Sequence, residues 1–220
     1  MNKYLLLLFS ILVVLIINLL RYKKYGWSCS QAILISGLEF TLGILGTLIL
    51  FFIENNEWGG TSFFGAVLLI PVFFLPISKC FRLSYARLMD YVAPSGLAMY
   101  MVNKWNCYVA GCCVGRNIGF SPEGIPKYFP SQIVEIIVTG IIVIVLLILE
   151  CRMAFSQRLY PLGLILYGLS RFVLNMFREE WVTTKMIMPF GNIWSLVAIG
   201  VGVAWLFFQN KRKVSSDEST

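Results

Sequence analysis

The stretch that decides the fold runs from Pro130 to Leu149 and reads PSQIVEIIVTGIIVIVLLIL. After its first three residues it is almost entirely apolar, and Glu135 is its one charged residue. A helix needs about 20 predominantly apolar residues to cross the hydrocarbon core of a bilayer. The stretch therefore predicts a membrane-spanning helix that carries a single carboxylate near its beginning.

Six more apolar runs lie on either side of this stretch. Their ranges are Tyr4–Leu20, Ala32–Ile53, Ser62–Ile77, Tyr85–Asn103, Tyr160–Phe177 and Ile187–Phe208. Hydrophobic residues make up 58% of the 220 residues and charged residues only 13%, whereas soluble domains carry about 25% charge. We therefore expect an all-α, polytopic integral membrane protein with about seven transmembrane helices, in which 1–208 form a single membrane domain.

The basic residues between the runs predict the orientation of the chain. They gather in the segments that are cytoplasmic if the N-terminus is outside: Arg21, Lys23, Lys24, Lys79, Arg82, Arg87, Arg152, Arg158, Lys211, Arg212 and Lys213. The other segments mix both signs, through Glu54, Glu57, Arg178, Glu179, Glu180 and Lys185. Because cytoplasmic loops are enriched in Lys and Arg, we expect the N-terminus outside and a polar tail, 209–220, in the cytoplasm. The net charge of +7 then reflects topology, and no nucleic-acid binding is expected.

One connecting segment is long, the outer loop 104–129, and it contains Cys107, Cys112 and Cys113. The spacing C-x4-C-C lacks the paired C-x2-C of zinc sites, and the chain has no histidine to complete a ligand set. We therefore expect no metal. A disulfide that involves Cys107 is one alternative in an oxidising exterior. The alternative we favour is that the cysteines are small packing residues beside Gly111 and Gly115.

Charged residues at membrane depth are costly and usually face the interior of a helix bundle. Glu135 and Arg171 lie roughly 8 and 10 Å below the outer ends of their spans at the helical rise per residue, and Lys104 ends its span on the same side. One interpretation is an internal salt bridge between Glu135 and Arg171. The interpretation we favour is an anion site made of Arg171, Lys104 and Arg116, because the planar guanidinium fork pairs well with phosphate. Glu39 is also intramembrane and has no predicted partner.

Five segments carry a recognisable pattern, in this order: Gly59–Gly65 (GGTSFFG), Asp90–Pro94 (DYVAP), Asn103–Arg116, Pro130–Glu135 (PSQIVE) and Tyr167–Phe172 (YGLSRF). Together they are similar to the bacterial prolipoprotein diacylglyceryl transferases. The resemblance implies seven spans, an outward N-terminus and a place in the bacterial cell membrane. It also implies a phospholipid-dependent transferase of lipoprotein biosynthesis, which moves a diacylglyceryl group from phosphatidylglycerol to the lipobox cysteine of an exported prolipoprotein. The partners would be phosphatidylglycerol or another anionic phospholipid and the exported preprotein, with no cofactor.

The same resemblance, carried over by position, implies the site residues. The implied catalytic residues are Arg171, Tyr167 and Glu135, and the implied phospholipid-binding residues are Lys104, Arg116, Gln132 and Asn106. Without histidine, either Glu135 acts as the base or the cations lower the pKa of the acceptor thiol, whose thiolate is the nucleophile. We favour the second route, because an ion-paired carboxylate is a weak base.

The chain also departs from the pattern of that family. Phe64 stands where the family has a histidine, and Lys104 stands where its signature has an arginine. The signature's two asparagines and its glutamate become Cys107, Ala110 and Cys112, and the acidic residue expected after Arg171 is Asn175. The alternatives are therefore a non-catalytic relative that binds lipid or preprotein, or a transferase with a different acceptor. A small transporter is disfavoured, because no pair of broken helices marks a midplane site.

Overall fold

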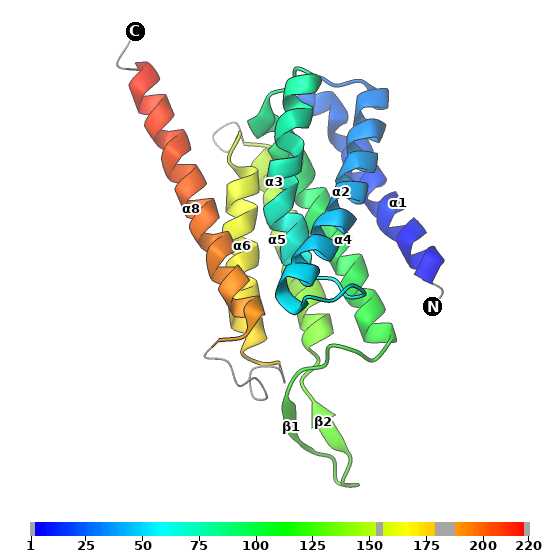
Figure 1. Ribbon diagram of the computed structural model, residues 1–220. Coiled ribbons are helices and arrows are strands. Elements are labelled where there is room, and N and C mark those ends of the chain that lie inside the picture. Colours follow the sequence, from blue (N-terminus) through cyan, green and yellow to red (C-terminus); the bar gives the residue numbers. More distant parts are fainter. Residues whose placement is uncertain (1–2, 153–155, 179–187, 218–220) are drawn as a thin grey trace.

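Seven long helices run between two ends of the molecule in the part of the chain that the structure describes (Figure 1). The structure is a computed structural model, and it describes residues 3–152, 156–178 and 188–217. The helices are α1 (Lys3–Arg21), α2 (Cys29–Asn55), α3 (Phe63–Cys80), α4 (Tyr85–Val109), α5 (Ser131–Glu150), α6 (Leu159–Asn175) and α8 (Phe190–Asp217). A short 3-10 helix, η1 (Tyr22–Tyr25), joins α1 to α2. The two termini lie toward opposite ends of the bundle (Figure 1), as an odd number of spans requires.

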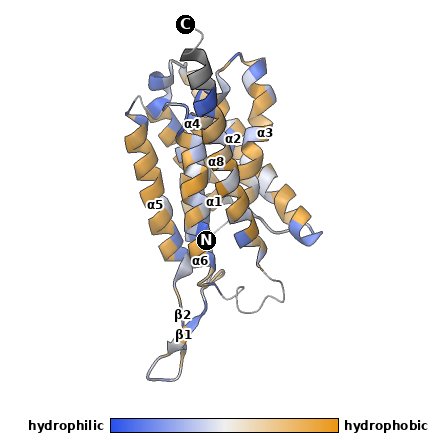
Figure 2. Ribbon diagram, turned by 90° about the vertical axis from the view of Figure 1, so that its left-hand side faces the viewer, coloured by the Kyte–Doolittle hydropathy of each residue, from blue (hydrophilic) through white to orange (hydrophobic). Residues whose placement is uncertain are grey.

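The helices have the lengths and surfaces of membrane spans. Five of them, α1, α2, α3, α5 and α8, are long and apolar enough to cross a membrane, and α6 is a shorter apolar helix of 17 residues. Most residues along these helices are hydrophobic (Figure 2). On α5 the exposed residues Ile137, Ile141, Ile144 and Ile148 follow the helical repeat and form one apolar stripe. The prediction of an all-α, polytopic membrane protein is confirmed.

Helix α4 can carry polar residues because five other helices surround it. It packs against α1, α2, α3, α5 and α6, and most of its middle, from Leu88 to Tyr100, is buried. Polar side chains on this helix can therefore be satisfied by protein rather than exposed to lipid. Asp90 is one example, because its Oδ1 accepts the backbone N–H groups of Leu159 (2.9 Å) and Tyr160 (3.2 Å) and so caps the start of α6.

A buried carboxylate on α2 finds neutral partners. Glu39 on α2 is 1% exposed. Its carboxylate accepts hydrogen bonds from the amide of Asn18 (2.9 Å) and from the hydroxyl of Ser95 (2.8 Å). These are the partners that the sequence did not identify for this residue.

Close helix contacts depend on small residues at two crossings. A Cβ atom on Gly65 of α3 would lie 2.0 Å from the carbonyl oxygen of Gly46 on α2. A Cβ atom on Gly202 of α8 would lie 2.7 Å from the carbonyl oxygen of Pro161 on α6. Without a hydrophobic force between helices in lipid, such close packing is a main source of helix association.

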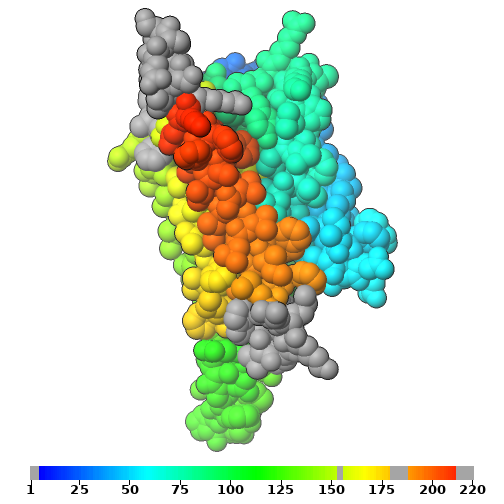
Figure 3. All heavy atoms as spheres, turned by 60° about the vertical axis from the view of Figure 1, so that its left-hand side comes forward, coloured from blue at the N-terminus to red at the C-terminus, as the bar shows by residue number. Residues whose placement is uncertain are grey.

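A small hairpin marks one end of the bundle, which we call the hairpin end. Helix α4 continues to Val109, so Lys104 lies inside the helix and the connection to α5 is 110–130. This connection contains the antiparallel strands β1 (Asn117–Phe120) and β2 (Pro126–Tyr128), which project away from the helices (Figures 1 and 3). The base of the hairpin is fixed to the end of α6, because the backbone N–H of Arg116 donates to the carbonyl of Phe177 (2.8 Å).

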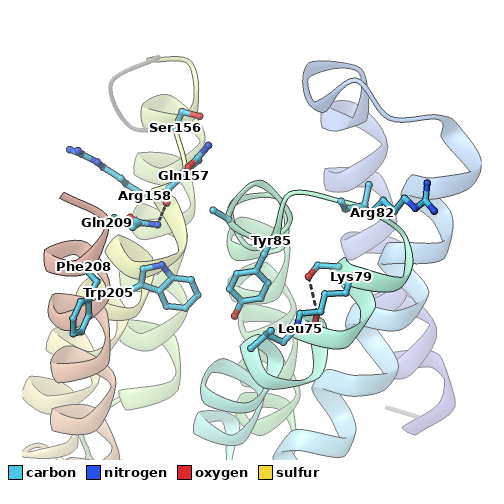
Figure 4. Close-up of a pocket in the computed structure, with 13 residues that line it drawn as sticks. Leu75, Lys79, Arg82, Tyr85, Ser156, Gln157, Arg158, Trp205, Phe208 and Gln209 are labelled. Carbon is cyan, nitrogen blue, oxygen red and sulfur yellow. Dashed lines mark hydrogen bonds between the residues drawn. The ribbon is translucent and has the colours of Figure 1, made fainter. Parts of the chain in front are cut away.

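The opposite end, where α5 ends and α6 begins, is the predicted cytoplasmic end. A cleft of about 840 Å³ opens there between the α3–α4 and α6–α8 pairs (Figure 4). Its walls combine Lys79 and Arg82 with Tyr85, Trp205 and Phe208.

The two ends of the last predicted span differ in how far the structure describes them. The expected outer charges Glu179, Glu180 and Lys185 and the expected first residue of that span, Ile187, lie outside the described residues. At the other end, α8 continues as a helix to Asp217, so most of the polar segment 209–220 extends this helix, and 218–220 lie outside the described residues.

Candidate functional site

Three cations from two helices and one adjoining segment surround Glu135 at the hairpin end. Arg171 Nη1 on α6 lies 2.7 Å from Glu135 Oε1, and Lys104 Nζ on α4 lies 2.8 Å from Glu135 Oε2. Arg178 Nε, just beyond α6, lies 4.0 Å from Oε1. The carboxylate is 1% exposed. The ion pair between Glu135 and Arg171 that the sequence suggested is therefore present, and it belongs to a larger buried cluster.

A tyrosine that the sequence did not single out connects the members of this cluster. The hydroxyl of Tyr100 donates to Glu135 Oε2 and accepts a hydrogen bond from Arg171 Nη1 (2.9 Å). Tyr100 lies four residues before Lys104 on α4, and residues with this spacing share one helix face. The signal that could have identified Tyr100 is this spacing from an intramembrane lysine.

Tyr167 lies beside the cluster inside an aromatic wall. Its ring is 1% exposed and lies 5.4 Å from the ring centroids of both Tyr100 and Phe64. Its hydroxyl and Arg171 Nε have no hydrogen-bond partner within the described part of the chain. Because buried polar atoms are nearly always paired, these two atoms are available to a ligand.

Phe64, where the resemblance implies a histidine, is a buried aromatic residue. It is 3% exposed, and Arg171 Cζ lies 6.0 Å from the centre of its ring. Phe64 therefore lies beside both Arg171 and Tyr167.

The structure does not bring Arg116 into the cluster. Arg116 is exposed, and its Cζ lies 5.3 Å from the ring centre of Phe177. Arg178, which the charge pattern assigned to an outer loop, is 9% exposed and takes the third position near Glu135. The expected grouping of Arg171, Lys104 and Arg116 is thus replaced by Arg171, Lys104 and Arg178, because the base of the hairpin holds the Arg116 backbone against the segment that follows α6.

Gln132 and Asn106 are placed differently from the cations. Gln132 is 3% exposed, and its side-chain amide donates to the carbonyl oxygen of Cys112. The neighbouring hydroxyl of Ser131 donates to the carbonyl oxygen of Cys113 (2.7 Å). Gln132 thereby positions the loop over the start of α5. Asn106 is half-buried on α4, one residue before Cys107.

Cys107, near the end of α4, and the loop residues Cys112 and Cys113 converge at the hairpin end. The Sγ atoms of Cys107, Cys112 and Cys113 all lie within 4.8 Å of one another, and all three are free. Hydrogen bonding from the Cys107 thiol, aided by the charges of Lys104 and Arg178, lowers the pKa of the Cys113 thiol to about 5. Cys107 is half-buried, and Cys112 and Cys113 are exposed. That the three cysteines act as small packing residues beside Gly111 and Gly115 stays a prediction.

Comparisons with known proteins agree with the resemblance seen in the sequence. The family model described as prolipoprotein diacylglyceryl transferase matches residues 4–208. The phosphatidylglycerol–prolipoprotein diacylglyceryl transferase of Tropheryma whipplei (strain Twist) is 29% identical over 163 residues, covering 66% of this chain and 60% of that relative. The chain thus spans less than two thirds of the length of this curated relative.

Two further relatives match over more of their length. The protein of the same name from Clostridium tetani (strain Massachusetts / E88) is 23% identical, covering 83% of this chain and 82% of the relative. That from Acinetobacter baumannii (strain SDF) is 24% identical, covering 86% and 81%. The long apolar helices and the family model, which matches nearly the whole membrane domain, lead to one conclusion: this multi-pass protein of the bacterial cell membrane belongs to the prolipoprotein diacylglyceryl transferase family.

Proposed function

We propose that this protein transfers a diacylglyceryl group from phosphatidylglycerol to the lipobox cysteine of exported prolipoproteins. The observation that carries the proposal is the charge of the buried cluster. Lys104, Arg171 and Arg178 surround one carboxylate, that of Glu135, which leaves a formal excess of two positive charges among the described residues. A buried excess of charge is costly unless a counter-ion compensates it, and a lipid phosphate supplies the missing negative charge.

The excess of two positive charges suits the transfer reaction as well as the binding of the lipid. A phosphodiester headgroup carries one negative charge, and the glycerol phosphate that leaves carries up to two. Two uncompensated cations therefore match the leaving group better than the bound lipid. Fixed groups that stabilise charge as it develops lower the barrier, because they bind the transition state more tightly than the ground state.

Arg171 and Tyr167 are the residues best placed to contact the phosphate. One nitrogen of Arg171 is held by Glu135 and Tyr100, while its Nε has no partner within the described residues. The remaining N–H groups of the fork can donate to phosphate oxygens in a bidentate manner. The unpartnered hydroxyl of Tyr167 lies beside them and can donate a further hydrogen bond.

The chemical step follows from these positions. The acceptor thiolate attacks the glycerol carbon that bears the phosphate, so that a C–S bond forms and the C–O bond breaks. Glycerol phosphate leaves with the electron pair, and the cluster holds its negative charge. Glu135 acts as a positioning residue for the three cations, because a carboxylate paired with them is a weak base.

The test is transfer of labelled glycerolipid from phosphatidylglycerol to a lipobox peptide by the full chain in lipid nanodiscs. We expect transfer by the wild type, and none to a peptide with serine in place of the lipobox cysteine. The same gene is expected to restore lipoprotein maturation in a bacterium depleted of its own transferase. Failure in both experiments would favour the alternative that Phe64 suggests, a non-catalytic relative that binds lipid or preprotein.

A further inference from the structure

We propose that Cys107, Cys112 and Cys113 form a three-thiolate site for a thiophilic d10 metal ion such as zinc, with a fourth coordination position open to the acceptor thiol. The role of this fourth position rests on the proposed transferase function, whereas the metal site itself does not.

The geometry of the three sulfur atoms is close to that of a bound ion. A tetrahedral zinc ion with Zn–S bonds of about 2.3 Å holds its sulfur ligands about 3.8 Å apart. The three Sγ atoms already lie within 4.8 Å of one another. Each pair therefore needs to approach by about 1 Å at most, which side-chain rotation can supply.

The loop is held in this shape before any ion binds. Gly111 and Cys113 adopt left-handed backbone conformations, with φ of 67° and 58°, and these turn the chain back toward Cys107 on α4. Ser131 and Gln132 at the start of α5 hold the carbonyl oxygens of Cys113 and Cys112. A left-handed non-glycine residue persists only where its surroundings fix it, so these anchors keep the three thiols together.

The surroundings favour a charged thiolate site over a buried apolar one. Three thiolates and a divalent ion carry one net negative charge, and Lys104, one of the cations around Glu135, lies three residues before Cys107 on the same helix. Cys112 and Cys113 are exposed, so the ion would keep an open side. Three protein ligands with an open fourth position are typical of catalytic rather than structural zinc.

The open position offers a route to the nucleophile in a chain that has no histidine. A thiol that coordinates a metal ion is deprotonated outright. On binding, the lipobox thiol would release its proton to solvent and remain as a metal-bound thiolate. It would then attack the lipid's glycerol carbon, forming the C–S bond as the C–O bond to phosphate breaks. The thioether product is a poor ligand and leaves the ion.

Binding is tested on the purified full chain with reduced thiols, using cadmium and zinc as probes. We expect one equivalent of metal by elemental analysis and a cadmium–thiolate absorption band. The triple variant Cys107→Ser/Cys112→Ser/Cys113→Ser should bind none, and the matched control Cys29→Ser/Cys80→Ser/Cys151→Ser should bind one. No binding by the reduced wild type, or binding retained by the first variant, would overturn the site. A second contrary result would be a disulfide between any two of the three cysteines. It is looked for in protein whose free thiols are alkylated inside the cells, before purification.

The fourth position is tested with the lipobox peptide. The cadmium–thiolate band should grow by roughly one third when a fourth thiolate joins three, and the serine peptide should leave it unchanged. Chelation should lower transfer roughly tenfold or more, because a free cysteine thiol of pKa about 8.5 is mostly protonated near neutral pH, with recovery on adding zinc. Transfer unaffected by metal removal would overturn the role in activation while leaving the transferase proposal intact. Metal binding without any transfer would contradict the transferase proposal and support the metal site.

Discussion

The two ends of the bundle each hold a buried carboxylate beside an arginine and a tyrosine, yet the ratio of positive to negative charges differs between them. At the predicted cytoplasmic end, Arg21 Nε lies 3.0 Å from both oxygens of Glu150, and the Tyr25 hydroxyl donates to the same carboxylate. The other nitrogens of Arg21 donate to the backbone carbonyls of Tyr91 (2.7 Å) and Asp90 (3.2 Å). One buried arginine meets one carboxylate, and each of its nitrogens has an acceptor.

The hairpin end uses the same residue types, but some of their charges and hydrogen-bonding atoms have no partner among the described residues. Glu135 faces three cations instead of one, and the described residues supply no partner for Arg171 Nε or for the Tyr167 hydroxyl. A saturated, balanced pair such as Arg21–Glu150 needs no ligand and stabilises the fold. An uncompensated buried charge is costly, so the excess charge and the unpartnered atoms support the proposal that the hairpin end binds an anion.

The largest difference between the two ends is expected when Arg171 and Arg21 are each replaced by lysine. Arg171→Lys should reduce transfer by about 100- to 1000-fold, the usual cost of removing one group that stabilises developing charge, because an ammonium cannot replace the fork. Arg21→Lys should instead lower the thermal unfolding midpoint in micelles and leave transfer per folded molecule unchanged. Transfer rates that fall equally in the two variants would show that the ends are functionally alike.

The second comparison replaces each carboxylate by its amide. Glu135→Gln leaves three buried cations without a carboxylate and should cost about 3–5 kcal/mol of stability, as expected for a broken buried pair. Glu150→Gln should cost less, because Arg21 keeps two carbonyl acceptors. Both losses are measured by thermal unfolding in detergent micelles.

Added lipid distinguishes the two amide variants. Phosphatidylglycerol should recover stability in Glu135→Gln more than phosphatidylcholine does, because an anionic ligand that binds only the folded state shifts unfolding upward. It should have no such selective effect on Glu150→Gln. Equal recovery with both lipids would contradict the assignment of the hairpin end as the anion site.

The sequence predicted most of the fold because each span is an almost unbroken apolar run. It also predicted that Lys104, Glu135 and Arg171 share one level, since helical rise alone fixes depth along a span. It did not single out Tyr100, for which the only signal is its four-residue spacing from Lys104. It also did not place Arg178 in the cluster, because Arg178 lies beyond the end of an apolar run. Which side chains meet is decided by how the helices are rotated, and a single apolar pattern carries little of that information.

The connection between α4 and α5 was even harder to predict from the sequence. The spacing of Cys107, Cys112 and Cys113 gave no metal signature, yet their sulfur atoms converge. That convergence depends on left-handed turns at Gly111 and Cys113 and on anchors from α5, which are contacts between segments distant in sequence.

A smaller effect is expected from removing one hydroxyl at each end. Tyr100→Phe removes a donor to Glu135 and an acceptor for Arg171, so transfer should fall about tenfold, the equivalent of a hydrogen bond to a charged group. Tyr25→Phe should lower the unfolding midpoint by a few degrees without changing transfer per folded molecule. The comparison would fail if Tyr25→Phe proved the more damaging to transfer.

The smallest change in the wild-type background should come from Phe64→His. The new imidazole would face Tyr167 and Arg171, and the nearby cations would favour its neutral form, which can accept a proton. If the cysteine-bound metal already supplies the thiolate, transfer should change less than about tenfold, well below the contribution of a needed general base. In the Cys107→Ser/Cys112→Ser/Cys113→Ser background, the same histidine should restore transfer, whereas Phe64→Asn, which is polar but not a base, should not. Equal transfer by the histidine and asparagine variants in that background would show that position 64 offers no route to the acceptor thiol.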